Sequence, residues 1–385
     1  MPASPADESE PSDVMAEAAG PAPSVVVALS TEVKRLGRAS GLDAIGLTTA
    51  APFASAAVEI QRRKRVGTSG RLRFTFGDPR STDVTRTFPA ARSLVVGARS
   101  YVPEIGEPPS RPLAGHIARF AVGDAYEPLR QALARIAELL LARGYQAEVL
   151  VDDNRLVDRA AAVRAGVAWW GKSTMAIAPK FGPWLLFGSV VTDARLVPDE
   201  PMARDCGTCS ACIPACPTGA LDHVGTLDAT RCIAYWLQTP GIIPSELRTA
   251  IGSRIYGCDE CLVSCPPGQR ISAEERPSLD AAVDLATLLI ASDEELLTRH
   301  GHFYIPRRNP AYLRRNALVA LANVGDRSHF RLIEPYLDHR LADVRAHAVA
   351  AIVALGGNAT EPPLAARFTQ ESHPGVIAEY GAGVS

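Results

Sequence analysis

All eight cysteines of this 385-residue chain lie between residues 206 and 265. The first four follow the spacing C-x2-C-x2-C-x3-C-P, which runs from Cys206 through Cys209 and Cys212 to Cys216. In this spacing three thiolates bind one [4Fe–4S] cluster and the fourth binds a different one. The chemistry predicted for this stretch is therefore the transfer of single electrons at low potential.

A second cysteine group completes the ligand count. Cys258, Cys261 and Cys265 repeat the pattern with Ser264 where a third cysteine would stand, and Cys232 lies alone between the groups. Two clusters need eight thiolates in all. We predict one cluster on Cys206, Cys209, Cys212 and Cys265, and another on Cys216, Cys232, Cys258 and Cys261. In this assignment Cys232 takes the place that Ser264 leaves empty.

Structural zinc and disulfide bonds are the other common uses of cysteine. Zinc takes tetrahedral groups of four ligands, often two C-x2-C pairs. The eight cysteines here fall into groups of four, one and three along the chain, which do not provide such pairs. Disulfides are typical of small secreted chains, and we expect no signal peptide here. The spacing favours two [4Fe–4S] clusters.

A second candidate for chemistry is the acid pair Asp152 and Asp153, which ends an apolar run at 146–152 before a predicted helix. In an open α/β sheet, ligands bind at the edge where such strands end. Successive strand residues point to opposite faces, so only one of these carboxyl groups faces a given pocket. The structural alternative is helix N-capping by Asp153 or Asn154.

The next segment holds further polar candidates. Asp158 and Arg159 lie in the predicted helix, where an ion pair is the default interpretation. The stretch G-V-A-W-W-G-K-S-T-M at 166–175 has glycines that permit close backbone approach to a ligand, and Lys172 could meet a phosphate or carboxamide. It lacks the leading glycine spacing of a P-loop, which argues against nucleoside triphosphate binding.

In combination these features resemble one known family. The order of the chain's motifs is similar to that of epoxyqueuosine reductase, from about residue 40 to about residue 355. These motifs are, in chain order, VD-x4-5-DR, R-A-G, W-x-G-K-x-x-M, the eight cysteines, C-I-A-Y, G-C-D-E-C and R-R-N-A-L. The resemblance implies a cobalamin- and iron–sulfur-dependent oxidoreductase. It would reduce epoxyqueuosine to queuosine at the wobble position of tRNA.

The resemblance also implies roles for single residues. The family's proton-donating acid corresponds to Asp152, and Arg159 falls where the family contacts RNA. Asp152, Ala176 and Phe187 fall where the family lines the cobalamin pocket, and base-off cobalamin is expected. The eight cysteines match the family's cluster ligands one for one.

Two basic runs are candidates for RNA contact, since a formal net charge of −2 gives the whole chain no general attraction for nucleic acid. One is Arg-Arg-Lys-Arg at 62–65; the other joins Arg307-Arg308 with Arg314-Arg315. A solvated helix face is the alternative for each. The family's C-terminal helical part helps to hold tRNA, so we predict tRNA contacts from Arg314 and Arg315.

The chain also departs from the family pattern. After VD the family has Gly, Pro or Ala with Thr or Ser, where residues 153–155 are Asp-Asn-Arg; its D-Y-H appears at 124–127 as Asp-Ala-Tyr-Glu. A cobalamin and iron–sulfur reductase of a small molecule, similar to reductive dehalogenases, is therefore the alternative function. A plain electron carrier is a third possible function, but such a protein would not need a strand that ends in an acidic residue.

The elements that position these residues follow from hydrophobic periodicity. Helices are predicted at 24–38, 56–65, 126–143 and 156–165, and strands at 42–47, 93–101, 146–152 and 184–191. Their alternation favours an α/β domain. Helices at 312–323 and 344–355 resemble HEAT-type units.

We therefore predict an α+β multidomain protein. Its parts are a disordered tail at 1–22, an α/β cobalamin-binding catalytic domain at 23–195, a ferredoxin-like domain with two [4Fe–4S] clusters at 196–278, a HEAT-like α-helical region at 279–358 and a loose C-terminal tail at 359–385. The chain has no apolar run long enough to span a bilayer. We expect a cytoplasmic monomer with no membrane contact, supplied by an external low-potential electron donor.

Overall fold

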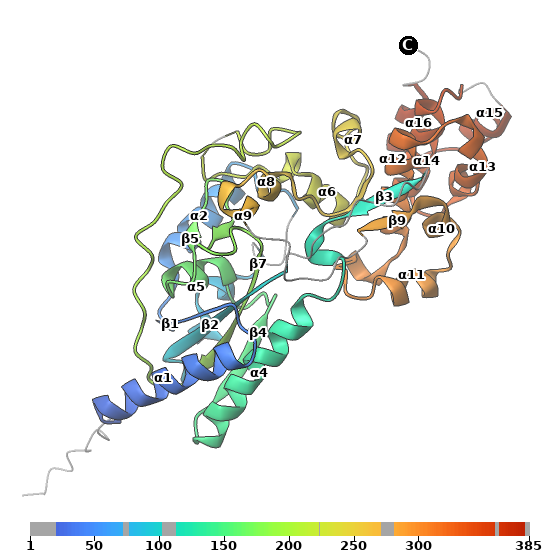
Figure 1. Ribbon diagram of the computed structural model, residues 1–385. Coiled ribbons are helices and arrows are strands. Elements are labelled where there is room, and N and C mark those ends of the chain that lie inside the picture. Colours follow the sequence, from blue (N-terminus) through green and yellow to red (C-terminus); the bar gives the residue numbers. More distant parts are fainter. Residues whose placement is uncertain are drawn as a thin grey trace, which may run out of the picture.

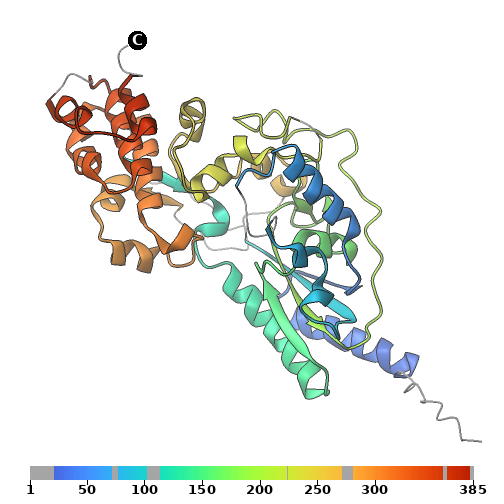
Figure 2. The ribbon, with the colours of Figure 1, turned by 180° about the vertical axis from the view of Figure 1, so that it is seen from behind.

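The computed structural model describes residues 21–71, 77–101, 113–222, 224–270, 281–358 and 362–381. The N-terminal half forms a sheet flanked by helices, the cysteine-bearing segment lies beside it, and the C-terminal helices lie at the other end (Figure 1). The same succession is visible from behind (Figure 2). The predicted tail at 1–22 lies, except for its last two residues, outside the described residues.

A four-stranded sheet forms the centre of the N-terminal half, in the order β1-β2-β7-β4. Its strands are β1 (Ala44–Thr49), β2 (Ser93–Ser100), β7 (Leu185–Thr192) and β4 (Ala147–Val151). They lie close to the four predicted strands, but all neighbours are antiparallel, unlike those of a doubly wound parallel sheet. Consequently β2 and β4 run in the same direction and end at the same edge.

Helices cover both faces of this sheet. Helix α1 (Pro23–Ala39) and helix α4 (Tyr126–Ala142) share one hydrophobic core with Val95, whereas α5 (Asp158–Arg164) shares another with Leu94 and Val96. This division follows from the two-residue period of strand β2, which sends neighbouring side chains to opposite faces. Helix α2 (Ala54–Arg65) precedes β2.

Two glycines let α4 pack closely on the sheet. A Cβ atom at Gly97 would lie 3.0 Å from the Cδ2 atom of Leu133, and one at Gly188 would lie 2.8 Å from its Cδ1 atom. Any larger residue would push Leu133, and α4 with it, away from the strands.

A second sheet crosses the predicted domain boundaries. Strand β3 (Ala114–Ile117) pairs in parallel with β8 (Arg254–Tyr256) and antiparallel with β9 (Ala282–Asp284). One strand thus comes from each of the three predicted domains. The proposed limits at 195 and 278 divide the sequence, but they do not separate independently closed sheets.

The cysteine-bearing segment consists of short elements. Its helices are α6 (Ile233–Gln238), α7 (Ser245–Ile251), α8 (Glu260–Val263) and α9 (Pro266–Gln269). The hairpin of β5 (Trp169–Trp170) and β6 (Ala176–Ile177) lies on the N-terminal side of this segment in the sequence.

The C-terminal part is helical, as predicted. It contains α10 (Leu285–Ile290), α11 (Asp293–Arg299), α12 (Ala311–Val324), α13 (Phe330–Ile333), α14 (Ala342–Ala354), α15 (Pro362–Phe368) and α16 (Pro374–Gly381). Helices α12 and α14 match the helices expected at 312–323 and 344–355 and share one core. Their HEAT-like class remains a prediction. In the part of the chain that the structure describes, no helix is long and apolar enough to cross a membrane.

The prediction of a loose tail at 359–385 is wrong for residues 362–381. Val376 and Tyr380 of α16 are buried in the core of the helical part, and Leu364 of α15 is buried there too. An ion pair of 2.6 Å between Arg248 and Glu379 fastens α16 to α7. The Gly- and Pro-rich composition concealed these apolar anchors, which lie about one helical turn apart.

Candidate active site and cluster-binding region

The first group of thiols lies around Cys265. The Cys265 thiol interacts electrostatically with Cys206, Cys212 and Cys209, which are all residues of the first spacing pattern. None of the eight cysteines forms a disulfide bond, and Cys209 is exposed. Residues about 55 positions apart in the sequence are therefore brought together here, in the grouping predicted for one cluster.

The second group lies around Cys261, whose thiol interacts electrostatically with Cys258, Cys232 and Cys216, and also with Cys212 of the first group. Cys232 immediately precedes α6, and backbone N–H groups of Ala234 and Tyr235 donate toward its sulfur. The hydroxyl of Ser264 is buried without a hydrogen-bond partner among the described residues. The division of the eight cysteines into two ligand sets remains a prediction, and Cys232 interacts electrostatically with Cys216, Cys258 and Cys261 of its predicted set.

The donor set fits [4Fe–4S] clusters chemically. Burial raises the pKa of the Cys258 and Cys265 thiols to about 11, so at neutral pH these thiols lose their protons only when a metal binds. The N–H group of Ala220 donates to the Cys216 sulfur over 3.2 Å. Such N–H groups stabilise bound thiolates and tune cluster potential. In the described ranges, no three or more Cys, His, Asp or Glu side chains are grouped to hold a single metal ion.

The hairpin of β5 and β6 covers the first thiol group. Trp169 and Ile177 pack against Cys265 and Cys206 in one hydrophobic cluster. The Lys172 ammonium group donates to the carbonyl oxygen of Gly207 over 2.7 Å. Lys172, which was predicted from the sequence as a possible ligand of a phosphate or carboxamide, therefore binds the loop that carries the first cysteines.

Asp152 follows the last residue of β4 with an unusual backbone conformation. Its φ of 51° lies in the left-handed region, which aspartate tolerates better than most residues do. The side chain is exposed at the sheet edge. Asp153 diverges from it, since its carboxylate forms an ion pair of 2.7 Å with Arg155 and accepts the Arg155 N–H. Neither acid caps α5, whose N-cap is Val157.

The protein around Asp152 favours the neutral acid. Although the residue is exposed, desolvation by the surrounding protein raises the pKa of its carboxyl group, with Arg130 and Arg159 opposing this and Asp153 adding to it. A raised pKa is what a proton donor near neutral pH requires. Arg159 is exposed and forms no ion pair with Asp158 in the described structure, contrary to the default expected from their adjacency.

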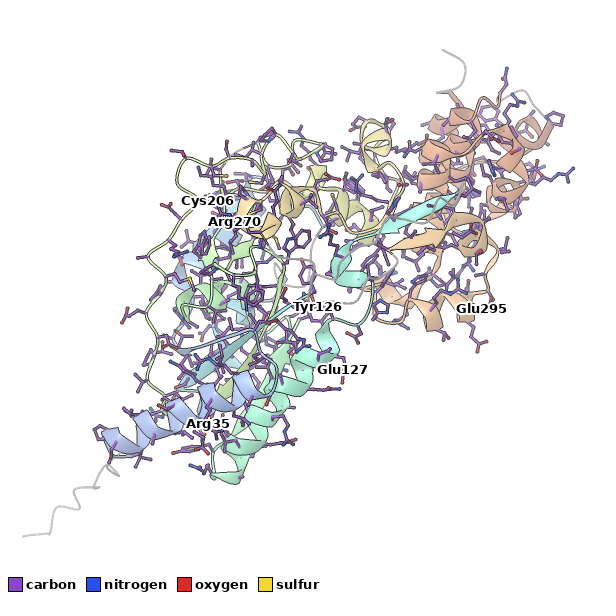
Figure 3. The ribbon with its side chains drawn as sticks, in the orientation of Figure 1. Arg35, Tyr126, Glu127, Cys206, Arg270 and Glu295 are labelled. Atoms are coloured by element: carbon purple, nitrogen blue, oxygen red, sulfur yellow. The ribbon has the colours of Figure 1, made fainter. Side chains whose placement is uncertain are left out.

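Three tyrosines that the sequence did not single out lie in this region, and two of them interact with Asp152. Tyr126 at the start of α4 and Tyr256 at the end of β8 interact electrostatically with Asp152. Tyr101, directly after β2, interacts with Arg159 and with Cys261. Burial raises the pKa of all three phenols, so they stay protonated. Figure 3 labels Tyr126 and, in the cysteine-bearing segment, Cys206.

This geometry joins the two predicted chemistries. The ends of β2 and β4 lie at one edge, and there Tyr101 links the thiol of Cys261 to the surroundings of Asp152. Two signals could have located the tyrosines: Tyr101 ends a predicted strand, and Tyr126 is the tyrosine retained from the D-Y-H pattern. Tyr256 gave no signal, because it comes from a distant part of the chain.

Comparison with known proteins agrees with this site. A family model described as a 4Fe-4S double cluster binding domain matches residues 205–268. Epoxyqueuosine reductase of Bacillus cereus is 30% identical over 371 residues, which covers 92% of this chain and 97% of the relative. That of Bacillus subtilis is 32% identical, over 79% of this chain and 81% of the relative. The chain belongs to the epoxyqueuosine reductase family.

A solved structure extends this likeness to the fold. A crystal structure of epoxyqueuosine reductase with an epoxyqueuosine-modified tRNA-Tyr stem loop has a TM-score of 0.84 and 30% identity, and covers 93% of this chain and 98% of that one. The family fold is therefore present nearly from end to end, including the helical part.

Two residues that epoxyqueuosine reductases would place against cobalamin are buried here. Ala176 in β6 and Phe187 in β7 belong to the hydrophobic core between the sheet and α5. Phe187 lies opposite Ala98 of β2, and Ala176 pairs with Trp170. Their side chains fill this core, so a cofactor contact would come from their backbone, as predicted for Ala176.

The structure corrects the prediction of tRNA contact by Arg315. Its side chain is 0% exposed, and its guanidinium donates to the carbonyl oxygens of Thr239, Gly241 and Trp236 over 2.6 to 2.9 Å. It therefore has no surface to offer a phosphate. Arg314 also offers little surface to a phosphate, because its side chain is 11% exposed and ion-paired with Asp293.

The other half of that basic run is available to a ligand. Arg307 and Arg308 are exposed, with left-handed φ values of 53° and 52°. Nearby Tyr304 exposes 51% of its surface. The Tyr304 N–H donates to the hydroxyl of Tyr256 over 2.7 Å. Tyr304 thus connects this basic and aromatic surface to the neighbourhood of Asp152.

The run at 62–65 resembles an ordinary helix face. Arg62 and Arg63 both pair with Glu59, and their hydrogen bonds hold the pKa of that carboxyl at about 2. Lys64 and Arg65 are exposed. One of its four positive charges is consequently offset by Glu59 within α2 itself.

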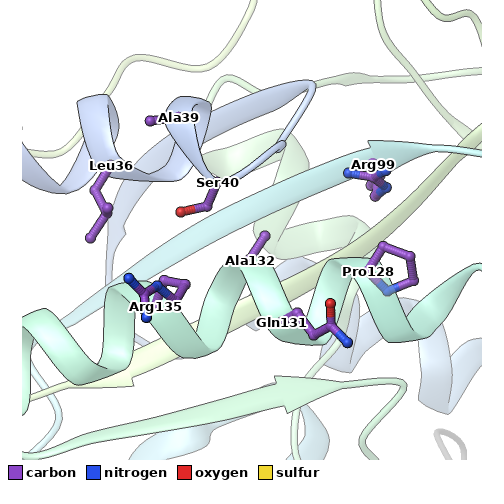
Figure 4. A pocket seen from close by; sticks show the side chains of 8 residues that line it. All are labelled: Leu36, Ala39, Ser40, Arg99, Pro128, Gln131, Ala132 and Arg135. Atoms are coloured by element: carbon purple, nitrogen blue, oxygen red, sulfur yellow. The ribbon is translucent and has the colours of Figure 1, made fainter.

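Two cavities lie away from Asp152. One of about 590 Å³ lies between α1, β2 and α4, with Ser40, Arg99 and Gln131 in its lining (Figure 4). The other, of about 700 Å³, is lined by residues that include Thr218 and Trp236, near the second thiol group. Neither is lined by Asp152, Ala176 or Phe187, so neither is assigned to cobalamin.

Proposed function

We propose that this chain reduces epoxyqueuosine to queuosine at the wobble position of tRNA. Membership of the epoxyqueuosine reductase family supports this activity, and the relative solved with a modified tRNA stem loop supports tRNA as the substrate. The observation that carries it is local. Asp152, whose pKa is raised, and Tyr101 follow two strands that end at one edge of the sheet, and both interact electrostatically with Arg159; Tyr101 also interacts with Cys261 of the second thiol group.

The electron path starts at the cysteines. We assign one [4Fe–4S] cluster to each group of four thiols, and these clusters supply single electrons at low potential when bound. Exposed Cys209 makes the first cluster the natural entry for an external electron donor. Cys261 interacts electrostatically with Tyr101, so a cluster held by the second group would lie on the side toward Asp152.

We propose that residues at this edge would hold cobalamin, which the family resemblance implies. When bound, it supplies a strong reductant or nucleophile toward a strained carbon–oxygen bond. The residues fit a cofactor at this edge because Asp152 is exposed there. The backbone at Ala176 and the segment around Phe187 are the further proposed contacts.

The protein's own part in the reaction is proton transfer. Conversion of an epoxide to an alkene takes two electrons and two protons and releases the oxygen as water. Asp152 donates a proton to the epoxide oxygen, which it can do because desolvation keeps its carboxyl group neutral to higher pH. Arg159, exposed beside it, orients the substrate through its phosphate or base oxygens.

The proposed RNA surface consists of Arg159, Tyr304, Arg307 and Arg308. Arginines bind phosphate oxygens, and an exposed tyrosine can stack on an unpaired base. Single-stranded anticodon loops are recognised in this way. Tyr304 touches Tyr256, which neighbours Asp152, so a loop bound on this surface has its wobble base near the acid.

The proposal includes the division of the chain into parts, its oligomeric state and its location. The catalytic part at 23–195 and the cluster part at 196–278 act together with a HEAT-like part from 279 onward that holds tRNA. The protein works as a cytoplasmic monomer. Turnover of tRNA that carries epoxyqueuosine distinguishes this function from the alternative, reduction of a small molecule.

The test is turnover of a defined substrate. The protein is reconstituted anaerobically with iron, sulfide and cobalamin and mixed with a chemical low-potential reductant and tRNA that carries epoxyqueuosine. Nucleoside analysis should show epoxyqueuosine replaced by queuosine in equal amount. If protein loaded with both cofactor types leaves epoxyqueuosine intact, the proposed function is wrong.

A further inference from the structure

The indole of Trp169 is a buried hydrogen-bond donor that no described group satisfies. Trp169 is 6% exposed, and its Nε1 atom is buried without a hydrogen-bond partner among the described residues. The other tryptophans differ from it: Trp184 and Trp236 each donate the indole N–H to a backbone carbonyl oxygen, and Trp170 is 49% exposed. Since buried N–H groups nearly always have an acceptor, Trp169 requires one beyond the side chains and backbone around it.

The side chains packed around this indole show what kind of acceptor fits. Trp169 pairs with Ile177 across the hairpin of β5 and β6, and both belong to one buried cluster with Cys265. Met202 and Cys206 pack against the same cluster. Within this set of side chains, only sulfur atoms can accept a hydrogen bond. A buried water molecule needs about two to four polar partners, which this apolar packing does not offer.

Two further contacts hold the hairpin against the first cysteine loop. The Lys172 ammonium group donates to the carbonyl oxygen of Gly207 over 2.7 Å. The guanidinium carbon of Arg204, shortly before Cys206 in the sequence, lies 5.9 Å from the centre of the Trp169 ring. The indole is therefore held between the hairpin and the loop that carries the first predicted ligand set.

We propose that the Trp169 indole N–H donates a hydrogen bond to a sulfur atom of the [4Fe–4S] cluster assigned to Cys206, Cys209, Cys212 and Cys265; the inference rests on the cluster assignment in the proposed function. Reduction makes the cluster more negative, and a hydrogen bond to sulfur is stronger when the acceptor carries more negative charge. Trp169 thus stabilises the reduced cluster and raises its potential. With this donor in place, the entry cluster accepts an electron more readily from the external reductant.

The first experiment measures the potentials and needs neither tRNA nor turnover. The cluster-loaded protein is titrated with reductant and followed by electron paramagnetic resonance. Trp169→Phe keeps an aromatic ring but removes the N–H group. It should lower the equilibrium constant for reduction of one cluster about tenfold, which moves the midpoint potential by about 59 mV to more negative values. Unchanged potentials in a Trp169→Phe protein with full iron content overturn the proposal.

Trp170→Phe is the matched control for this titration. Trp170 is the next residue of the same strand, so its side chain points to the opposite face, and it is 49% exposed. Its replacement should leave both potentials unchanged. A shift in Trp170→Phe as large as that in Trp169→Phe would overturn the proposal, because it would show a general effect of the hairpin.

The second experiment detects the hydrogen bond itself. In reduced, cluster-loaded protein labelled with ¹⁵N at the indole nitrogens, pulsed electron paramagnetic resonance should show a ¹⁵N coupling that is lost in Trp169→Phe and kept in Trp170→Phe. A wild-type spectrum without this coupling overturns the proposal. If Trp169→Phe does not fold, persistence of the coupling in Trp184→Phe supports the assignment to Trp169, and its loss there overturns it.

The outcomes also separate this inference from the proposed function. A wild-type protein that shows the coupling but leaves epoxyqueuosine intact supports the role of Trp169 and contradicts the proposed activity. A wild-type protein that forms queuosine without the coupling contradicts only the role of Trp169. Failure of the wild-type protein to bind any cluster contradicts both.

Discussion

At the scale of single residues, the conformation of Asp152 separates two adjacent acids. Its left-handed φ turns the chain sharply after β4, so its carboxyl group stays at the sheet edge while Asp153 turns to Arg155. Non-glycine residues in that region cost of order 1 kcal/mol or more, and such strain persists where the surrounding structure imposes it. Asp153, beside the proposed donor, is thereby paired with Arg155, although its charge still contributes to the raised pKa of Asp152.

We predict that Asp152→Asn keeps both clusters but loses turnover by about a hundredfold or more, since asparagine keeps the shape and tolerates the left-handed region but cannot donate the proton. The wild-type rate should fall as pH rises through the raised pKa of Asp152, because only the neutral acid donates. Iron content and pH profiles of queuosine formation check this. Near-normal turnover in Asp152→Asn would remove the residue from the mechanism.

At the scale of elements, very short helices and turns position the cluster ligands. Cys232 precedes α6 and Cys265 precedes α9, so backbone N–H groups at the start of each helix point at a sulfur. The hairpin of β5 and β6 then closes over Cys206 and Cys265 through Trp169. Helices this short would not form alone and depend on these contacts.

Cys232→Ala should leave the protein with about half of its iron, because one cluster keeps four thiolates and the other has three. Ser264→Ala is the matched control: its hydroxyl has no described partner, so both clusters should persist. Iron and sulfide analysis with electron paramagnetic resonance of the reduced protein measures the outcome. Full iron in Cys232→Ala would refute the ligand assignment.

At the scale of the whole molecule, buried polar contacts tie the helical part to the catalytic part. Arg315 on α12 binds three carbonyl oxygens around the end of α6. Asn316 donates to the carbonyl oxygens of Leu237 and Ile255. Strand β3 adds a sheet that spans all three predicted domains. The helical part and Asp152 are thus parts of one framework.

Arg315→Ala should lower the free energy of unfolding by about 3 kcal/mol or more, since it leaves the carbonyl groups of Thr239 and Gly241 without their donor and removes one of the two donors to that of Trp236. Arg307→Ala with Arg308→Ala should instead keep stability but weaken tRNA binding and reduce its salt dependence by about two phosphate contacts. Denaturant unfolding and binding at several salt concentrations distinguish them. Unchanged affinity in the double variant would exclude this surface.

Some features followed from local pattern alone. The cysteine spacing predicted the two groups of thiols, and hydrophobic periodicity placed β2, α4, β4 and α12 to within a few residues. These signals work because ligand spacing and helix or strand period are written within short stretches. By contrast, β3, β8 and β9 have at most four residues each and carry no period of their own.

What the sequence by itself determined was chemical capacity: eight thiols in a two-cluster pattern and an acid at a strand end. Tertiary structure decided which groups work together. It buried Arg315, paired Asp153 with Arg155, ordered the supposed tail and brought Tyr101 and Tyr256 to the surroundings of Asp152. The reason is physical, since exposure, pairing and desolvation depend on contacts between segments far apart in the chain, which local spacing does not encode.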